Sequence, residues 1–256
     1  MRAPEGKETG TDRLDRAFDG ALAPYRRDDG PLGVLFSGGV DSSLIAWELH
    51  DRPNLTLVTV GVPGSPDLVA ARSASALLSL PWTEVVVPID EVRSVAAEIA
   101  EETDRLAPVP RSVQIAFAVA VRSSPVDRLL CGQGADELFL GYAHFRGRSA
   151  AEAARIADGD LGRLITEDWP RSQRIAARFG RSVFAPYLDP GFMEAARSIP
   201  VDRRLPEPEP KSWFRSWARH RGLPAEIAAR PKRALQYGSG VDRALRDGER
   251  RTVRNA

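Results

Sequence analysis

The sequence contains a single cysteine, Cys131, among 256 residues. One cysteine excludes an intramolecular disulfide and any four-cysteine zinc site, and it is typical of a protein in a reducing compartment. Charge of one sign is also not in excess, because 36 lysines and arginines stand against 35 aspartates and glutamates, for a formal net charge of +1. The chain therefore has no overall positive charge that would favour nucleic acid as a partner.

Long apolar runs are missing as well. The N-terminal stretch MRAPEGKETGTDRLD has no apolar core of the kind that a signal peptide requires. Nowhere do about 18 uncharged apolar residues, the length of a membrane-spanning helix, follow one another. We therefore expect neither secretion nor membrane insertion, and we predict a cytoplasmic protein.

Short apolar runs alternate with helical patterns along the chain. The runs predict five buried strands, at residues 32–36, 55–60, 83–87, 128–131 and 182–188. The patterns repeat every three or four residues and predict helices over 68–78, 92–106 and 113–121. Strands that alternate with helices in this way form right-handed crossovers and a parallel sheet with helices on both faces, so the predicted fold class is α/β.

The chain divides into a lead, a core and a cover. We expect a helical or irregular lead over residues 1–30, a core domain over 31–205 and a cover segment of the same domain over 206–256. The proline-rich stretch LPEPEPK marks the last boundary, because proline fixes φ and disfavours helix in the preceding residue. Trp213 and Trp217 are four residues apart, which favours the buried stripe of a cover helix over a base-stacking platform.

The stretch LFSGGVDSSL, residues 35–44, follows the first predicted strand. Ligands of parallel sheets bind beyond the carboxyl ends of the strands, and Gly38 and Gly39 let backbone N–H groups approach a polyanion there. The next helix adds partial positive charge at its N-terminus. Asp41 would repel a phosphate unless a divalent cation lay between them. Hydroxyl donors are available at Ser37, Ser42 and Ser43. The stretch therefore predicts a phosphate bound with magnesium (Mg2+).

An ordinary glycine turn in which Asp41 caps the helix is the alternative, but the full string SGGVDSS is more specific than that. The string lacks the Gly-Lys-Ser/Thr ending of the common P-loop. It resembles the pyrophosphate-binding loop of enzymes that split ATP between the α and β phosphates. Asparagine synthetase, NAD synthetase, GMP synthetase and tRNA-modifying ligases belong to that group.

Further stretches resemble the synthetase domain of asparagine synthetase in particular. They are TVGVPGSPDL at 59–68, CGQGADELFLGY at 131–142, FAPYLDPGFMEAA at 184–196 and the basic stretch 211–234. The resemblance runs with gaps from about residue 30 to about residue 240. It implies an adenine nucleotide alpha hydrolase-like fold, with a five-stranded parallel sheet of order 3-2-1-4-5, and a PP-loop ATP pyrophosphatase domain over 31–205. It also implies ATP and Mg2+ as cofactors.

The resemblance assigns the adenine to the second strand. The backbone of Val60, before Gly61, would pair with the purine edge while Leu35 packs on the ring. Asp67 either contacts the ligand or is the N-cap of the following helix, and the sequence leaves both open.

In the strand order that the resemblance implies, the loop after the fourth strand faces the first loop. Cys131 and Gly132 are assigned to the nucleotide site, and Asp136 is expected to share a metal ion with Asp41 across the pyrophosphate. Asp136 and Glu137 could instead begin a helix and complement its dipole, which is compatible with metal binding.

Two lysines are the expected catalytic cations. Lys232, in ARPKRA, and Lys211 would stabilise the negative charge that accumulates on the leaving pyrophosphate. Arg230 and Arg233 flank Lys232, and a basic run of this kind is otherwise usually a solvated face.

The chain departs from this family's pattern in two places. Met1 leads into a charged segment where glutamine-dependent relatives carry a catalytic N-terminal cysteine, so the nitrogen is expected from free ammonia, a separate glutaminase subunit or another amine. Gln133 stands where asparagine synthetases have glutamate, and an amide cannot act as a base at neutral pH. Gln133 could still orient a nucleophile. Cys131 replaces a serine and is expected to be a small buried residue rather than a nucleophile.

The leading hypothesis is a ligase that adenylates a carboxylate, releases pyrophosphate and transfers the acyl group to an amine, with aspartate and ammonia as the favoured pair. A β-lactam synthetase-like or macrocycle-forming ligase is the first alternative, since β-lactam synthetases also lack this glutamate. A nucleotide-binding subunit without turnover is the second. A tRNA-modifying enzyme ranks last, because cysteine pairs and an added RNA-binding domain are absent. The oligomeric state is left open, and a homodimer is compatible with the sequence.

Overall fold

A computed structural model describes residues 10–206, 209–231 and 234–246. Its centre is a parallel sheet of five strands in the order β3-β2-β1-β4-β5, as predicted. The strands are β1 (Leu32–Leu35), β2 (Leu55–Gly61), β3 (Trp82–Val86), β4 (Arg128–Leu130) and β5 (Ser182–Phe184). Because β1 and β4 are neighbours whose connections leave in different directions, their carboxyl ends form the switch point at which such sheets bind ligands.

Two predicted elements end earlier than expected. The fifth strand stops at Phe184 instead of Leu188, because Pro186 begins a short 3-10 turn, η3 (Pro186–Leu188). The predicted helix over 92–106 is two helices, α4 (Ile89–Glu98) and α5 (Ala100–Thr103), and Leu106 lies in the turn that follows them. The helix predicted over 113–121 is confirmed within α6 (Pro108–Arg122).

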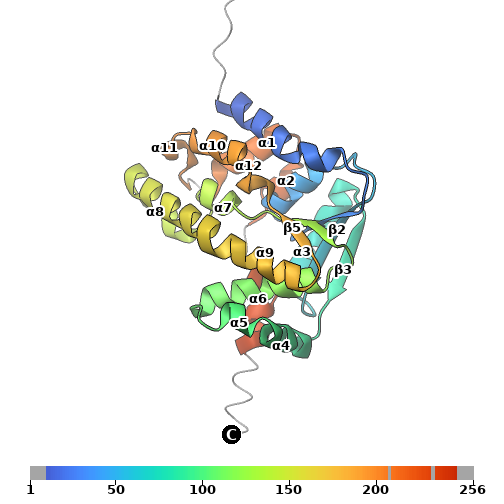
Figure 1. Ribbon diagram of the computed structural model, residues 1–256. Helices are drawn as coiled ribbons and strands as arrows, with labels where there is room; N and C mark the ends of the chain where they lie inside the picture. The colour runs from blue at the N-terminus through green and yellow to red at the C-terminus, as the bar shows by residue number, and fades with distance from the viewer. Residues whose placement is uncertain (1–9, 207–208, 232–233, 247–256) are drawn as a thin grey trace, which may run out of the picture.

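Each face of the sheet carries its own apolar core. Successive residues of a strand point to opposite faces, so Leu57 belongs to one core and Val58 to the other. The first core is covered by α1 (Gly10–Arg26), α2 (Val40–Glu48), α3 (Pro66–Leu78), α10 (Pro190–Arg197) and α12 (Ser212–His220). The second is covered by α4, α6 and α9 (Trp169–Arg178), which lie below the sheet in Figure 1.

The connection from β4 to β5 is the longest in the sheet. It contains α7 (Ala135–Leu138), η1 (Ala143–Phe145), α8 (Ala150–Arg163), the π-helix η2 (Leu164–Asp168) and α9. Ser149 starts α8 with a capping box, in which its hydroxyl accepts from the N–H of Glu152 and the Glu152 carboxylate accepts from the N–H of Ser149. A third small apolar core around Leu140 and Phe145 joins α7 to α8.

The C-terminal segment packs against both cores, with Phe214 and Ile227 in the first and Leu235 against the second. It contains α11 (Val201–Arg204), α12, α13 (Ala225–Ala228) and α14 (Leu235–Gly238). The buried stripe predicted for α12 is confirmed, because Trp217 is buried and Trp213 packs against the same core. Residues 207–208 of the predicted connector lie outside the described residues. Among the described helices, none has the length and apolar character that crossing a membrane demands.

We predict that Phe18 of α1 is a main anchor of the first core. Its ring is fully buried, stacks 5.5 Å from Tyr187 and meets the edge of Trp217 at 5.3 Å between centroids. Phe18→Ala should lower the free energy of unfolding by about 3–5 kcal/mol, measured by urea denaturation. Val69→Ala, at a side chain that is 65% exposed, is the control and should change it by less than about 0.5 kcal/mol. Equal effects of the two would contradict this role.

Candidate functional site

The loop after β1 is braced by its own hydroxyl groups. Gly38 has φ of +67°, and a Cβ there would lie 2.8 Å from the backbone oxygen of Ala70, so the turn requires glycine. The Ser37 hydroxyl accepts from the N–H of Gly39 at 3.3 Å. The Ser42 hydroxyl accepts from the N–H of Ser37 at 3.4 Å and donates to the Gly39 oxygen at 3.3 Å. These serines therefore hold the shape of the loop.

The first turn of α2 sends its polar side chains in two directions. Ser43 is fully buried, and within the described part of the chain its hydroxyl has no hydrogen-bond partner. Asp41 instead faces the C-terminal segment, where both of its carboxylate oxygens lie 2.7 Å from Nζ of Lys211. The N-cap of α2 is Gly39, so the alternative in which Asp41 caps the helix is wrong.

Lys211 lies between two carboxylates. Its side chain is 1% exposed, and its Nζ lies 2.7 Å from Asp136 Oδ1 as well as from Asp41. Asp41 follows β1, Asp136 follows β4 and Lys211 precedes α12, so three distant segments meet at the switch point. The structure thus brings Asp41 and Asp136 together as the sequence predicts, around the ammonium group of Lys211.

The surroundings keep Lys211 protonated. Burial alone would lower its pKa, but the charges and hydrogen bonds of Asp136 and Asp41 raise the pKa above the ordinary value for lysine. Its backbone has φ of +59°, an unusual conformation for a residue with a side chain, at a cost of about 1 kcal/mol. The Tyr187 hydroxyl donates to the backbone carbonyl of Asp41 at 2.8 Å, which helps to fix the position of Asp41.

Gly141 is a site residue that sequence reasoning missed. A Cβ at this position would collide with Oδ1 of Asp136 and with Cε of Lys211. The absence of a side chain there gives the lysine its room. Its position at the end of the GADELFLGY stretch is the only sequence signal for this role.

Glu137 and Tyr142 form a buried pair next to Asp136. The Tyr142 hydroxyl donates to Glu137 Oε1 at 2.5 Å, and Glu137 is buried. Burial and the neighbouring charge of Asp136 raise the pKa of Glu137 to about 7, although the hydrogen bond from Tyr142 acts in the opposite direction. Glu137 and Asp136 also lie in the first turn of α7, so the helix-dipole interpretation applies as well.

Two arginines order the C-terminal segment at the site. Arg230 holds the segment against the loop after β1, and Arg215 joins parts of the segment to each other. Sequence reasoning assigned no role to Arg215. Nη1 of Arg230 donates to the Ser37 carbonyl, and Nη2 lies 3.5 Å from Asp67 Oδ1. Buried Arg215 donates to the carbonyls of Pro210 at 3.0 Å and Arg230 at 2.8 Å. These groups converge on one pocket, which is lined by Ser37, Gly39, Val40, Asp41, Asp67, Lys211, Arg215, Arg230 and Pro231.

Asp67 is not the N-cap of α3. The N-cap is Ser65, and Asp67 lies two residues inside the helix, where it is buried and faces Arg230. The N-cap alternative for Asp67 is therefore wrong. Lys232, the other expected catalytic lysine, lies outside the described residues, as does Arg233.

The remaining predicted residues lie at the carboxyl ends of the neighbouring strands β1 and β2. Leu35 is half-buried at the end of β1, while Val60 and Gly61 end β2, where the Gly61 carbonyl accepts from the N–H of Val87 at 2.9 Å. They line the edge to which the adenine was assigned, and their role stays a prediction.

The loop after β4 begins with a buried thiol. Cys131 is buried, and burial raises its pKa to about 12, which agrees with the expectation that it is no nucleophile. Gly132 lies against Asp41, and Gln133 follows it as a half-buried side chain.

A signal for Lys211 exists in the composition. Only three of the 36 basic residues are lysines, namely Lys7, Lys211 and Lys232. Lysine offers a compact point charge where arginine offers a planar fork, and the gap between two carboxylates suits the smaller group. The arginines gave no such signal, because they are frequent throughout the chain.

Comparison with known proteins identifies the family. The chain matches the asparagine synthase family over residues 13–159 and 148–256. A putative glutamine-hydrolysing asparagine synthetase of Methanocaldococcus jannaschii is 28% identical, over 93% of this chain and 51% of the relative. The glutamine-hydrolysing asparagine synthetase of Gallus gallus is 30% identical, over 88% of this chain and 42% of the relative. The chain therefore spans about half the length of the curated relatives that it matches.

Similar solved structures include two other synthetases. NMN synthetase from Francisella tularensis is 12% identical with a TM-score of 0.45, over 94% of this chain and 87% of that one. NH3-dependent NAD synthetase from Campylobacter jejuni is 14% identical with a TM-score of 0.35, over 77% of this chain and 94% of that one.

We predict that ionisation of Glu137 makes the protein less stable as the pH rises. Its pKa is about 7 in the folded protein and 4.5 in the unfolded chain, so its stabilising contribution is complete below pH 4.5 and is lost as the pH rises through 7. Glu137→Gln keeps the acceptor for Tyr142 and cannot ionise. Between pH 5 and pH 8, wild type should lose about 2 kcal/mol more unfolding free energy than the variant in urea titrations.

The control for this prediction is Glu226→Gln, at an exposed position of α13, which should follow the wild-type pH dependence. Identical pH dependence in wild type and Glu137→Gln would show that Glu137 does not titrate in this range.

Proposed function

The chain belongs to the asparagine synthase family, and on that premise we propose that it is an ATP-dependent ligase that adenylates a carboxylate and transfers the acyl group to an amine. Aspartate and ammonia are the favoured pair. The observation that carries the proposal is the ion cluster at the switch point, where Nζ of Lys211 lies 2.7 Å from the carboxylates of Asp41 and Asp136 beside the braced loop. The cluster is a cation site next to a loop suited to phosphate.

The two carboxylates fit a magnesium ion. Mg2+ is usually held by one or two carboxylates together with substrate phosphates and water, rather than by a cage of protein groups alone. The donor set here has that composition, because the two carboxylates of Asp41 and Asp136 converge on one positive charge, the ammonium group of Lys211. Among the described residues, no cluster of three or more His, Cys, Asp or Glu could hold an ion without further ligands. When bound, magnesium would neutralise charge on the leaving pyrophosphate.

The chain's own cations would act on the same charge. In the proposed first step a carboxylate oxygen of the substrate bonds to the α phosphorus, and the bond from that phosphorus to the pyrophosphate oxygen breaks. Lys211 is held at the wall of the pocket and Arg230 at its loop, so both can stabilise the negative charge that the pyrophosphate gains. In the second step the amine nitrogen bonds to the acyl carbon and AMP leaves.

We predict that the cluster is required for turnover. Asp136→Asn and Lys211→Met should each lower the rate of pyrophosphate release from ATP, with aspartate and ammonium present, by about 100-fold or more. Asp158→Asn, at a surface ion pair with Arg197, is the matched control and should keep the wild-type rate. Release of ADP and phosphate in place of AMP and pyrophosphate would refute the chemistry. Binding of ATP without any pyrophosphate exchange would instead favour a non-catalytic subunit.

Gln133 motivates the second candidate function, a ligase for another amine or a larger carboxylate, as in β-lactam or macrocycle formation. An amide cannot take the proton that an attacking amine must lose. If ammonia is the substrate, Gln133→Glu should raise amide formation from ammonium at pH 7 by about tenfold. Gln173→Glu, at an exposed position of α9, is the control. No gain with ammonium, together with pyrophosphate release on other amines or acids, would favour the second candidate.

The nitrogen source is part of the proposal. The relatives named as glutamine-hydrolysing are about twice as long as this chain, and a separate glutaminase subunit would supply ammonia to it. The substrates are small molecules in either case.

A further inference from the structure

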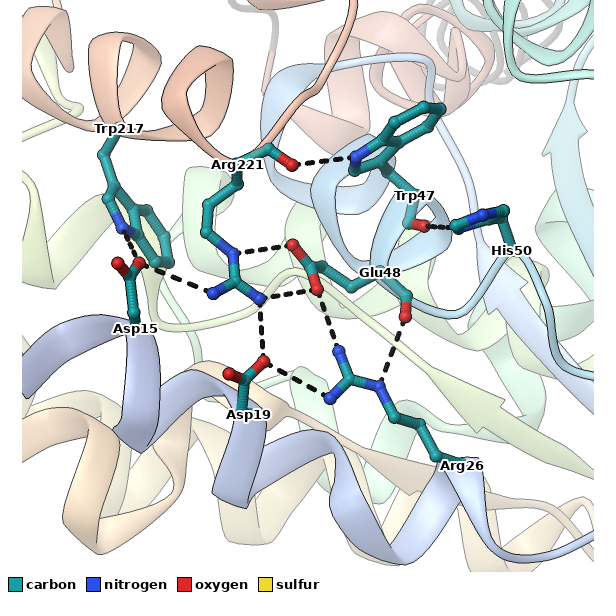
Figure 2. Close-up of polar contacts among 8 residues, drawn as sticks. All are labelled: Asp15, Asp19, Arg26, Trp47, Glu48, His50, Trp217 and Arg221. Carbon is teal, nitrogen blue, oxygen red and sulfur yellow. Dashed lines mark hydrogen bonds and ion pairs between the residues drawn. The ribbon is translucent and has the colours of Figure 1, made fainter. Parts of the chain in front are cut away.

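A second polar cluster lies at the far ends of the helices that carry the site. Glu48 is the last residue of α2, and Arg221 follows the last residue of α12. Nε of Arg221 donates to Glu48 Oε1 at 2.7 Å and Nη2 donates to Glu48 Oε2 at 2.6 Å, so the ion pair is bidentate (Figure 2). We refer to this pair as the Arg221–Glu48 clamp.

The clamp and the site join the same two helices. At their first turns, Lys211 before α12 meets Asp41 of α2, and at their last turns Arg221 meets Glu48. The helices therefore run in the same direction, with both N-termini at the site. The indole N–H of Trp47 adds a hydrogen bond to the Arg221 carbonyl at 3.0 Å (Figure 2).

Apolar packing does not by itself fix how far α12 is shifted along α2. Phe214 and Trp217 bury one side of α12, but apolar attraction has little directionality. A bidentate arginine–carboxylate pair has a defined geometry. The side chains of Arg221 and Glu48 are only 15% and 9% exposed, so water and salt screen the pair less than a surface ion pair.

The anchored unit carries more than Lys211. The turn after Arg221 leads into α13 and then to Arg230, and Arg215 ties α12 to this stretch through the carbonyls of Ala228 and Arg230. The three cations that the structure describes in the pocket on the C-terminal segment, Lys211, Arg215 and Arg230, therefore lie on one unit. Arg221 fixes the far end of that unit to α2.

We propose that Arg221 is a positioning residue, which acts through Glu48 to hold Lys211 in register with Asp41 and Asp136. The effect on catalysis rests on the proposed function, whereas the effect on the position of Lys211 does not.

The cluster contains its own control residue. Arg26 binds the same Glu48 carboxylate at 2.8 Å and Asp19 at 3.3 Å, but it comes from α1, and among the described residues its hydrogen-bond partners lie on α1 and α2 (Figure 2). Arg26→Met removes a guanidinium group from the cluster without detaching α12 from α2. In Arg221→Met, Glu48 and Asp19 still share Arg26, whereas Asp15 loses its ion pair at 3.5 Å and keeps the hydrogen bond from the Trp217 indole.

The first test follows Lys211 directly. The chain has only three lysines, so a short pulse of acetylating reagent can be assigned to Lys211 by peptide mass spectrometry. Arg221→Met should increase the acetylation rate of Lys211 about tenfold, because the ammonium leaves its carboxylates more often. Arg26→Met should leave the rate at the wild-type value. Urea titrations of each variant correct for global unfolding.

The second test is kinetic. Arg221→Met should lower kcat for pyrophosphate release, with aspartate and ammonium, by about 10-fold to 100-fold, because displaced catalytic groups cost rate. KM for ATP should change by less than about threefold, since the loop that binds phosphate is intact. The kcat of Arg221→Lys should lie between those of wild type and Arg221→Met, because lysine keeps the positive charge but cannot form the bidentate pair of the guanidinium group.

The outcomes separate the two proposals. If Arg221→Met leaves the acetylation rate of Lys211 unchanged, the positioning role is wrong. It is also wrong if Arg26→Met raises that rate as much as Arg221→Met does while the two variants lose the same unfolding free energy. If wild type releases no pyrophosphate while the acetylation contrast holds, the proposed function fails and the positioning role stands. Should Arg221→Met fail to fold, Glu48→Gln and Arg221→Lys provide the same contrast.

Discussion

The structure depends on one buried ammonium group shared by two carboxylates. A buried charge is costly unless it is paired, and Lys211 is buried almost completely between Asp41 and Asp136. Each partner comes from a different segment, so the loop after β1, the loop after β4 and the C-terminal segment must all be in place for any of them to be stable there. The chain thereby couples the closure of its C-terminal segment to the assembly of its charged site.

The same arrangement explains why the site lies where it does. In a parallel sheet the carboxyl ends of β1 and β4 are adjacent, and the turns after them diverge. The N-termini of α2 and α12 meet at that point, as the ion pair of Asp41 and Lys211 shows, which concentrates positive partial charge beside the braced loop. A polyanion with its cation would find complementary groups there, because the carboxylates of Asp41 and Asp67 line the same pocket as the cationic groups of Lys211 and Arg230.

Much of the fold and part of the site follow from local sequence patterns. Apolar runs and helical periodicity placed the strands to within a few residues. The proximity of Asp41 and Asp136, which both contact Lys211, was expected only from the family resemblance of the SGGVDSS and CGQGADEL stretches, and their sharing of a metal ion stays a prediction. Local patterns could not show that Lys211 lies between them, since that contact joins residues 170 positions apart. The same holds for Arg221 and Arg230, which are ordinary surface residues by pattern and acquire roles only through long-range packing. The N-cap of α3 was missed by two residues, because Ser65 and Asp67 are both good caps by residue type.

The proposed role of the Asp41–Asp136–Lys211 cluster is to support attack of a carboxylate on the α phosphate of ATP. The most direct measurement uses aspartate whose side-chain carboxylate carries oxygen-18, incubated with ATP, magnesium, ammonium and the protein. One labelled oxygen should appear in the phosphate of AMP, because the bond between the acyl carbon and that oxygen breaks when the amine displaces AMP. Amide product accompanied by AMP without the label, or by labelled inorganic phosphate and ADP, would contradict it.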